Sequence, residues 1–170
     1  MRSILLRERR FRWLDGPMDL WDVLLVLTVL VTGLAGGVFA AFSTFVMPGL
    51  RRLDPAAAAA AIAAINEDAV RPPFMTLFGA AVVVPAGSAV VGLVGGYDGA
   101  WLVLASTVLV VVGMLGVTAA GNVPLNNAIM AHRDAAGWAA FDRPWSRLNH
   151  VRTVACAASC ALAGVALAQA

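Results

Sequence analysis

The sequence contains no lysine and few charged residues of any kind. Twelve arginines supply its fixed positive charge, charged residues make up only 13% of the chain, and the net charge is +2. A typical soluble domain has about 25% charged residues, so this composition excludes an ordinary soluble domain and a disordered segment. The arginines form no basic face, which excludes a nucleic-acid-binding protein.

Cysteine, histidine and the common catalytic motifs are also scarce. Cys156 and Cys160 lie four residues apart in an apolar run, where helix geometry disfavours a disulfide, and we expect them to be packing residues. His132 and His150 have no cysteine or carboxylate at metal-ligand spacing. The sequence has no glycine-rich phosphate loop, HExxH or GxSxG motif, so it gives no support to hydrolytic or nucleotide-dependent chemistry. We predict neither a cofactor nor a metal.

Apolar residues, by contrast, make up 61% of the chain. Four stretches lack Asp, Glu, Arg and His, and each is long enough to cross the hydrocarbon layer, which takes about 20 residues as a helix. No stretch alternates with the period of a β-barrel strand. We predict an all-α, integral membrane four-helix bundle, multi-pass in the cell membrane. The expected transmembrane helices cover residues 21–47, 73–96, 100–123 and 149–168.

The expected domain organisation is a basic N-terminal tail, 1–19, followed by the four-helix domain, 20–170. The first apolar run is much longer than the core of a secretory signal, which favours an uncleaved anchor; alternatively, translation starts at Met18. The tail carries five arginines, and the loops on the other side of the membrane carry six or seven. Because these numbers are similar, the positive-inside rule favours neither orientation.

The first loop predicts a short additional helix. Asp54 is a suitable N-cap residue, and Pro55 suits the first turn of a helix. Pro72 ends the Ala-rich run that follows. Small and aliphatic residues fall on one stripe of this run, and Asn66 lies beside it. We expect an interfacial helix, lying on the mouth of the bundle or at the lipid surface.

Two clusters of polar residues lie at the ends of the third and fourth spans. Asn122 and Asn126 are four residues apart and share a helix face, where they could bond a neighbouring helix or a polar ligand. Trp145, Asn149 and Arg152 share one face of the fourth helix, with His150 on the adjacent stripe. These side chains could hold a flat molecule that carries oxygen, or could anchor the helix at the interface.

These clusters carry a resemblance to a known family. The segments that carry it are LAGGVF at 34–39, VMPGL at 46–50, AIN at 64–66, NVPLN at 122–126 and WSRLNHVRT at 145–153. In this order they resemble the anthrone-oxygenase-like family of small four-helix membrane proteins, over about residues 24–166.

The resemblance implies a cofactor-independent monooxygenase that oxidises a hydrophobic aromatic substrate of the anthrone type with O₂. Under this hypothesis His150 is the general base, because an anthrone methylene is acidic enough for an imidazole. Arg152, helped by Asn149 or Asn126, holds the developing oxyanion. Trp145 stacks on the substrate rings. The other expected substrate-binding residues are Asn122 and Asn66.

Other functions stay open at this point. A non-enzymatic membrane protein needs only the packing roles of these residues. A small transporter is disfavoured because no span contains an acid, and a haem or copper redox carrier would have to use His132 and His150. The expected partners are the lipid bilayer, a hydrophobic aromatic molecule and O₂, with a homo-oligomer as a further possibility and no nucleic acid.

Overall fold

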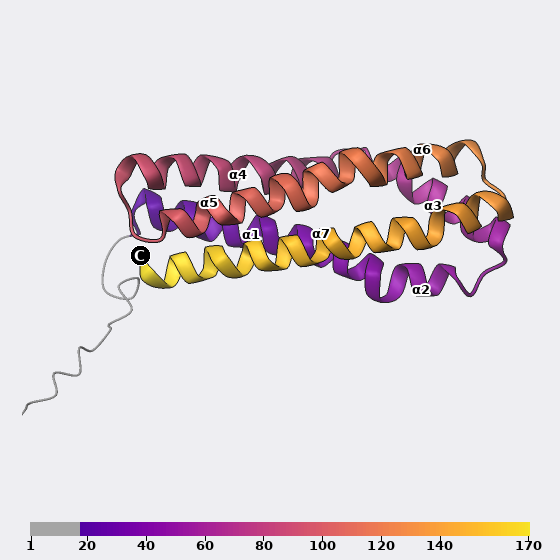
Figure 1. Cartoon of the computed structure of the whole chain (residues 1–170), viewed down its shortest axis with the longest axis horizontal. Helices are drawn as coiled ribbons and strands as arrows, with labels where there is room; N and C mark the ends of the chain where they lie inside the picture. Colours follow the sequence, from indigo (N-terminus) through magenta and orange to yellow (C-terminus); the bar gives the residue numbers. More distant parts are fainter. Residues whose placement is uncertain (1–17) are drawn as a thin grey trace, which may run out of the picture.

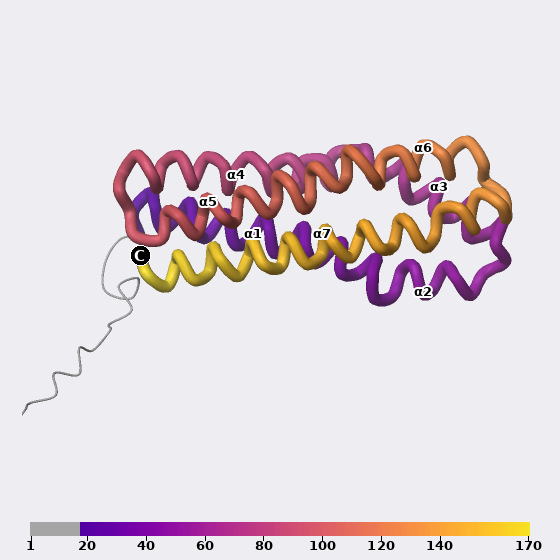
Figure 2. Tube along the Cα trace, in the orientation of Figure 1, coloured from indigo at the N-terminus to yellow at the C-terminus, as the bar shows by residue number. Residues whose placement is uncertain are grey.

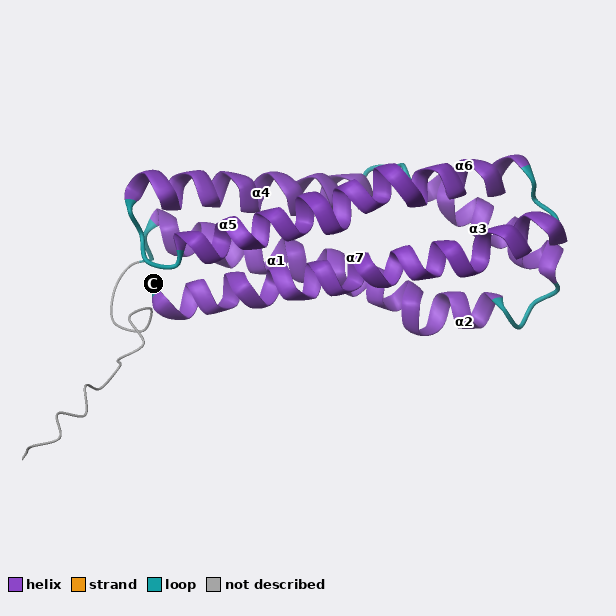
Figure 3. Cartoon of the chain, viewed as in Figure 1, coloured by secondary structure: helices purple, strands orange, loops and turns teal. Residues whose placement is uncertain are grey.

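A computed structural model describes residues 18–170 of the chain. These residues form an elongated bundle of four long helices, with a shorter helix across one end (Figure 1), and they contain no strand (Figure 3). The all-α prediction is confirmed, whereas most of the predicted basic tail lies outside the described residues. Three π-helical segments join α1 to α2 and α5 to α6. The helices are α1 (Leu20–Ala41), α2 (Met47–Leu50), α3 (Pro55–Ala69), α4 (Phe74–Gly95), α5 (Ala100–Val108), α6 (Val123–Ala131) and α7 (Ala135–Gln169), and the π-helical segments are Phe42–Val46, Leu109–Gly116 and Thr118–Asn122.

The four long helices are long and apolar enough to cross a membrane. The shortest of them, α4, has 22 residues and therefore spans about 33 Å, against a hydrocarbon thickness of about 30 Å. Large apolar side chains such as Val83, Val94 and Trp101 lie exposed on the outer surface of the bundle. Each of the four long helices carries such exposed apolar side chains, which is a property of a multi-pass membrane protein. The four spans are Leu20–Leu50, Phe74–Gly95, Ala100–Ala131 and Ala135–Gln169.

Local sequence signals set the ends of these helices. Asp19 caps α1, because its Oδ1 accepts a hydrogen bond from the backbone N–H of Asp22 (3.0 Å) while the Asp22 carboxylate accepts from the N–H of Asp19 (3.3 Å). The tight turn between α4 and α5 places Gly96 (φ 67°) and Gly99 (φ 79°) in the left-handed region. This region favours glycine, which lacks Cβ.

The fourth long helix begins well before residue 149, where the sequence predicted its start. Asp134 caps it by accepting a hydrogen bond from the N–H of Gly137 (2.8 Å), and the helix continues through Pro144 to Gln169. An interior proline costs about 3 kcal/mol. Trp138 and Phe141 are buried by the extra turns, and burial of each large apolar side chain contributes about 1.5–3 kcal/mol, which offsets the cost of the proline.

Helix α3 confirms the helix predicted in the first loop. The Asp54 carboxylate accepts hydrogen bonds from the first N–H groups of α3, as expected of an N-cap. Ala58, Ala59 and Ile62 are fully buried against α2, α6 and α7. The helix therefore covers the end of the bundle and packs on protein there.

Small residues bring the long helices close together. Helices α1 and α7 pack along most of their length (Figure 2). Hydroxyl pairs connect neighbouring helices in the apolar interior, between Thr28 and Ser88 (3.0 Å) and between Ser106 and Ser159 (2.7 Å). Such pairs satisfy polar groups that lipid cannot satisfy.

Candidate functional site

A cavity of about 310 Å³ lies at the end of the bundle that α3 covers. Its walls come from α1 and the following π-helical turn, α3, the start of α4, α6 and α7. Five of the seven predicted site residues line it, together with three phenylalanines. The lining residues are Val38, Phe39, Phe42, Ile65, Asn66, Asp68, Ala69, Phe74, Asn126, Trp145, Asn149 and Arg152.

Arg152 is the cation of this cavity and is almost completely buried, with 6% of its surface exposed. Its Nη2 donates to Oδ1 of Asn149 (2.8 Å) and its Nη1 to Oγ1 of Thr118 (3.2 Å), whereas Nε has no partner. The guanidinium carbon lies 4.4 Å from the ring centroid of Phe39 and 5.3 Å from that of Trp145. No carboxylate within residues 18–170 forms an ion pair with it. A buried charge without a counter-ion is costly, so this arrangement favours an anionic ligand.

Asn149 holds the guanidinium in place. Its Nδ2 donates to the carbonyl oxygen of Phe39 and to Oγ of Ser43, both at 2.8 Å. The π-helical turn Phe42–Val46 places Ser43 beside α7, and π-helical turns are frequent at functional sites. Because both ends of the fully buried Asn149 amide are bonded, the side chain orients Arg152 and has little freedom to do more.

Trp145 forms an aromatic wall of the cavity. Its Nε1 donates to Oδ1 of Asn126 (2.8 Å), and its ring stacks on Phe141 with the centroids 5.6 Å apart. Asn122 lies behind it, fully buried, with Nδ2 donating to the carbonyl oxygen of Trp145 at 3.4 Å. Asn122 and Asn126 therefore share a helix face and both contact Trp145, but Asn122 does not line the cavity.

Helix α3 contributes two further polar residues to the cavity, Asn66 and Asp68. The Nδ2 atom of Asn66 is buried and has no hydrogen-bond partner among the described residues. Asp68, which sequence reasoning did not select, is the carboxylate among the lining residues, and it pairs with the exposed Arg71 at 3.0 Å. The sequence feature that could have identified Asp68 is its position two residues after Asn66. The place of Phe39 and Phe42 in the cavity wall could not be predicted from their residue type, because Phe is common in any membrane helix.

His150 lies outside the cavity. It is exposed on the outer face of α7, where its Nδ1 is 2.7 Å from the carbonyl oxygen of Ser146 and 3.4 Å from Oγ of Ser43. It lines a separate groove with three arginines. The structure therefore brings Arg152 and the lining asparagines together and leaves the predicted base on another surface.

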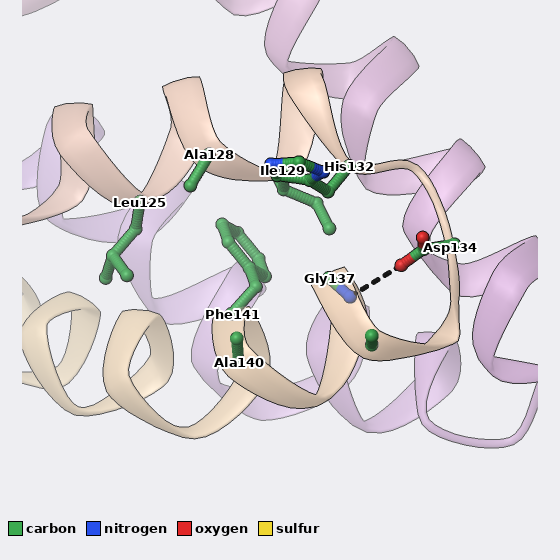
Figure 4. A pocket seen from close by; sticks show the side chains of 9 residues that line it. Leu125, Ala128, Ile129, His132, Asp134, Gly137, Ala140 and Phe141 are labelled. Atoms are coloured by element: carbon green, nitrogen blue, oxygen red, sulfur yellow. Dashed lines mark hydrogen bonds between the residues drawn. The ribbon is translucent and has the colours of Figure 1, made fainter.

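A further hollow of about 250 Å³ lies beneath the turn between α6 and α7 (Figure 4). Its walls are mostly apolar, and its polar groups are His132 and Asp134. The Asp134 carboxylate already accepts the hydrogen bond from Gly137. Within residues 18–170 no group of three or more His, Cys, Asp or Glu side chains is placed to hold a metal ion.

Comparison with known proteins connects this site to one family. The model of the family described as anthrone oxygenase matches residues 70–162. The matched segment includes α4 to α6 and most of α7, and with them Asn122, Asn126, Trp145, Asn149 and Arg152. No curated protein and no solved structure matches the chain. Since the matched segment is more than half of the sequence, the chain belongs to the anthrone oxygenase family.

Proposed function

We propose that the protein oxidises a flat, hydrophobic aromatic molecule of the anthrone type with O₂, in the cell membrane. The observation that carries this proposal is Arg152, a buried cation in the wall of an aromatic-lined cavity that pairs with no carboxylate of residues 18–170. Such a site favours a ligand that is apolar over most of its surface and carries negative charge at one oxygen.

The cavity suits a small aromatic ligand in size and in the chemistry of its walls. Its volume of about 310 Å³ lies at the lower end of the range for small-molecule sites, about 300–1,000 Å³. Phe39, Phe74 and Trp145 offer ring faces and edges, which favour offset or edge-to-face contacts with another ring. A hydrophobic substrate would reach such a site from the bilayer.

The reaction balances with O₂ as the oxidant. Loss of a proton from the methylene of an anthrone gives an enolate, whose carbon reduces O₂ and binds it as a hydroperoxide. Loss of water from the hydroperoxide leaves a carbonyl, so that CH₂ and O₂ give C=O and H₂O. Arg152 would stabilise the enolate oxygen through its N–H groups, and Asn149 would orient the guanidinium.

The proton-accepting group in this proposal is Asp68. Asp68 is among the residues that line the cavity, with a side chain that is 73% exposed and paired with Arg71, whereas His150 is not among them. A general base must come within hydrogen-bonding distance of the proton that it removes, and His150 could do so only for a substrate in the outer groove. We therefore assign this role to Asp68, in place of the histidine that the sequence favoured.

Turnover of anthrone by the full chain in lipid nanodiscs tests this function. We expect anthraquinone to form faster than in empty nanodiscs, with one O₂ consumed per product. With ¹⁸O₂, one labelled oxygen should appear in the new carbonyl. A rate equal to that of empty nanodiscs would refute the oxygenase function.

A further inference from the structure

A second polar site lies on the outer face of the bundle, apart from the cavity. It is a groove of about 380 Å³ between the end of α2 and the first half of α7. Arg51, Arg143, Ser146, Arg147 and His150 line it. None of these residues lines the cavity, so the groove requires an explanation of its own.

The positive charge of the groove exceeds its negative charge. Arg51 donates from Nε and Nη2 to the Asp142 carboxylate at 2.8–3.0 Å and to Oγ of Ser146 at 2.8 Å. The hydrogen bond to Asp142 raises the pKa of Arg51 above its usual value, so this guanidinium stays charged. Arg143 and Arg147 have no ion-pair partner in the described part of the chain. Three guanidinium groups thus face one carboxylate.

The two arginines without an ion-pair partner also lie close enough to repel each other. Arg143 and Arg147 are four residues apart on α7 and lie on the same face, where like charges repel and destabilise the helix. Both are exposed. An anion bound between them would remove this repulsion, and a phosphate suits guanidinium groups because it accepts two parallel hydrogen bonds from each.

The groove also lies at the boundary between polar and apolar surface. Helix α7 has 35 residues, about 52 Å of helix, so that part of it extends beyond a hydrocarbon layer of about 30 Å. One turn beyond Arg147 and His150, on the same faces, lie Val151 and Val154, which are 48% and 67% exposed. A cationic groove directly above an exposed apolar strip matches a molecule with an anionic head and apolar chains.

We propose that this groove binds the phosphate group of an anionic phospholipid, whose acyl chains lie along Val151 and Val154. Arg143 and Arg147 bind the phosphate, and Arg51, held by Asp142, closes the groove on the side of α2. The lipid occupies a site distinct from the substrate cavity, and its binding does not depend on the proposed oxidation.

Native mass spectrometry of the full chain, titrated in detergent with phosphatidylglycerol or phosphatidylcholine, tests the proposal. We expect the wild type to bind phosphatidylglycerol more tightly. Each arginine near an anionic lipid surface contributes about fivefold in affinity, so Arg147→Gln should weaken this binding about fivefold. The double variant with Arg143→Gln should weaken it about 25-fold. Inorganic phosphate should not displace the bound lipid.

Arg52→Gln provides the matched control, because Arg52 is exposed at the same end of the bundle but does not line the groove. It removes the same charge and should change lipid affinity by less than twofold. An equal loss in this variant would overturn the proposal, since binding would then follow net charge alone. Equal binding of both lipids by the wild type, or full displacement by inorganic phosphate, would also overturn it; the latter would indicate a site for free anions.

Discussion

Replacing Arg152 by methionine should separate recognition of the ligand's charge from recognition of its shape. Methionine fills a similar volume on α7 but removes every N–H group that could reach an anionic oxygen. In the wild type the Nε–H is buried and has no hydrogen-bond partner among residues 18–170, so the guanidinium keeps an unused donor. The aromatic walls formed by Phe39, Phe74 and Trp145 remain in the variant.

The expected loss follows from the strength of one charged hydrogen bond. Such a bond contributes about 1.5–3 kcal/mol, which corresponds to a loss of about 10- to 150-fold in affinity. A hydroxyanthracene ionised at the assay pH should lose this amount on Arg152→Met. Its methyl ether, which has nearly the same shape and no charge, should lose less than about threefold. Anthrone oxidation should fall about 10²- to 10³-fold, the usual effect of removing an oxyanion donor.

Quenching of tryptophan fluorescence measures both affinities, because Trp145 lines the cavity. Arg152→Lys is the control: it keeps the charge but loses the planar fork, and its affinity should lie between those of the wild type and the methionine variant. Equal losses for the ionised ligand and its ether would refute the reasoning, since Arg152 would then act only by packing. Unchanged affinity for the ionised ligand would remove Arg152 from the site.

Three further predictions concern the base, the orienting amide and helix packing. Asp68→Asn should lower anthrone oxidation at least tenfold while His150→Ala keeps most of it, since Asp68 is among the lining residues of the cavity and His150 is not; the reverse ranking of the two initial rates would return the base role to the histidine. Asn149→Leu should weaken binding of the ionised ligand about tenfold, because it removes an acceptor that holds the guanidinium; an unaltered dissociation constant would exclude this orienting role. Gly113→Ala should destabilise the bundle by about 1–3 kcal/mol, because a Cβ there meets a methyl group of α7 at 2.5 Å, whereas Gly87→Ala has open space and should not. Thermal melts in detergent would show the difference, and equal melting temperatures for the two variants would count against close packing at this glycine.

Much of the fold could be predicted from the sequence because lipid restricts the choices. A run of about 20 apolar residues has to be a helix to satisfy its own backbone, and four such runs predict four spans. The N-cap at Asp54 is a local signal, and the sequence predicted it correctly. The early start of α7 was not predicted, because it depends on the burial of Trp138 and Phe141 against α3, which is a tertiary effect.

The candidate site was predictable in part for a similar reason. Trp145, Asn149 and Arg152 recur at helical spacing, so one face of α7 brings them together. His150 follows Asn149 by one residue, which turns it by about 100° around a helix of 3.6 residues per turn, and it points into the outer groove. Asp68 and the aromatic walls come from other helices, whose rotation about their own axes no sequence pattern fixes.

The two halves of the bundle differ in how closely their helices pack. The cavity, the groove and the hollow described above lie at the end that carries α3 and the turn between α6 and α7. In the other half, Gly92 makes room for the indole ring of Trp21 and Gly99 lies against Ala166, so the helices pack closely there. Under the proposed function, a substrate from the bilayer would therefore enter and leave through the monolayer next to α3. For the proposed oxidation, the orientation of the protein in the membrane would then decide which of the two leaflets supplies the substrate.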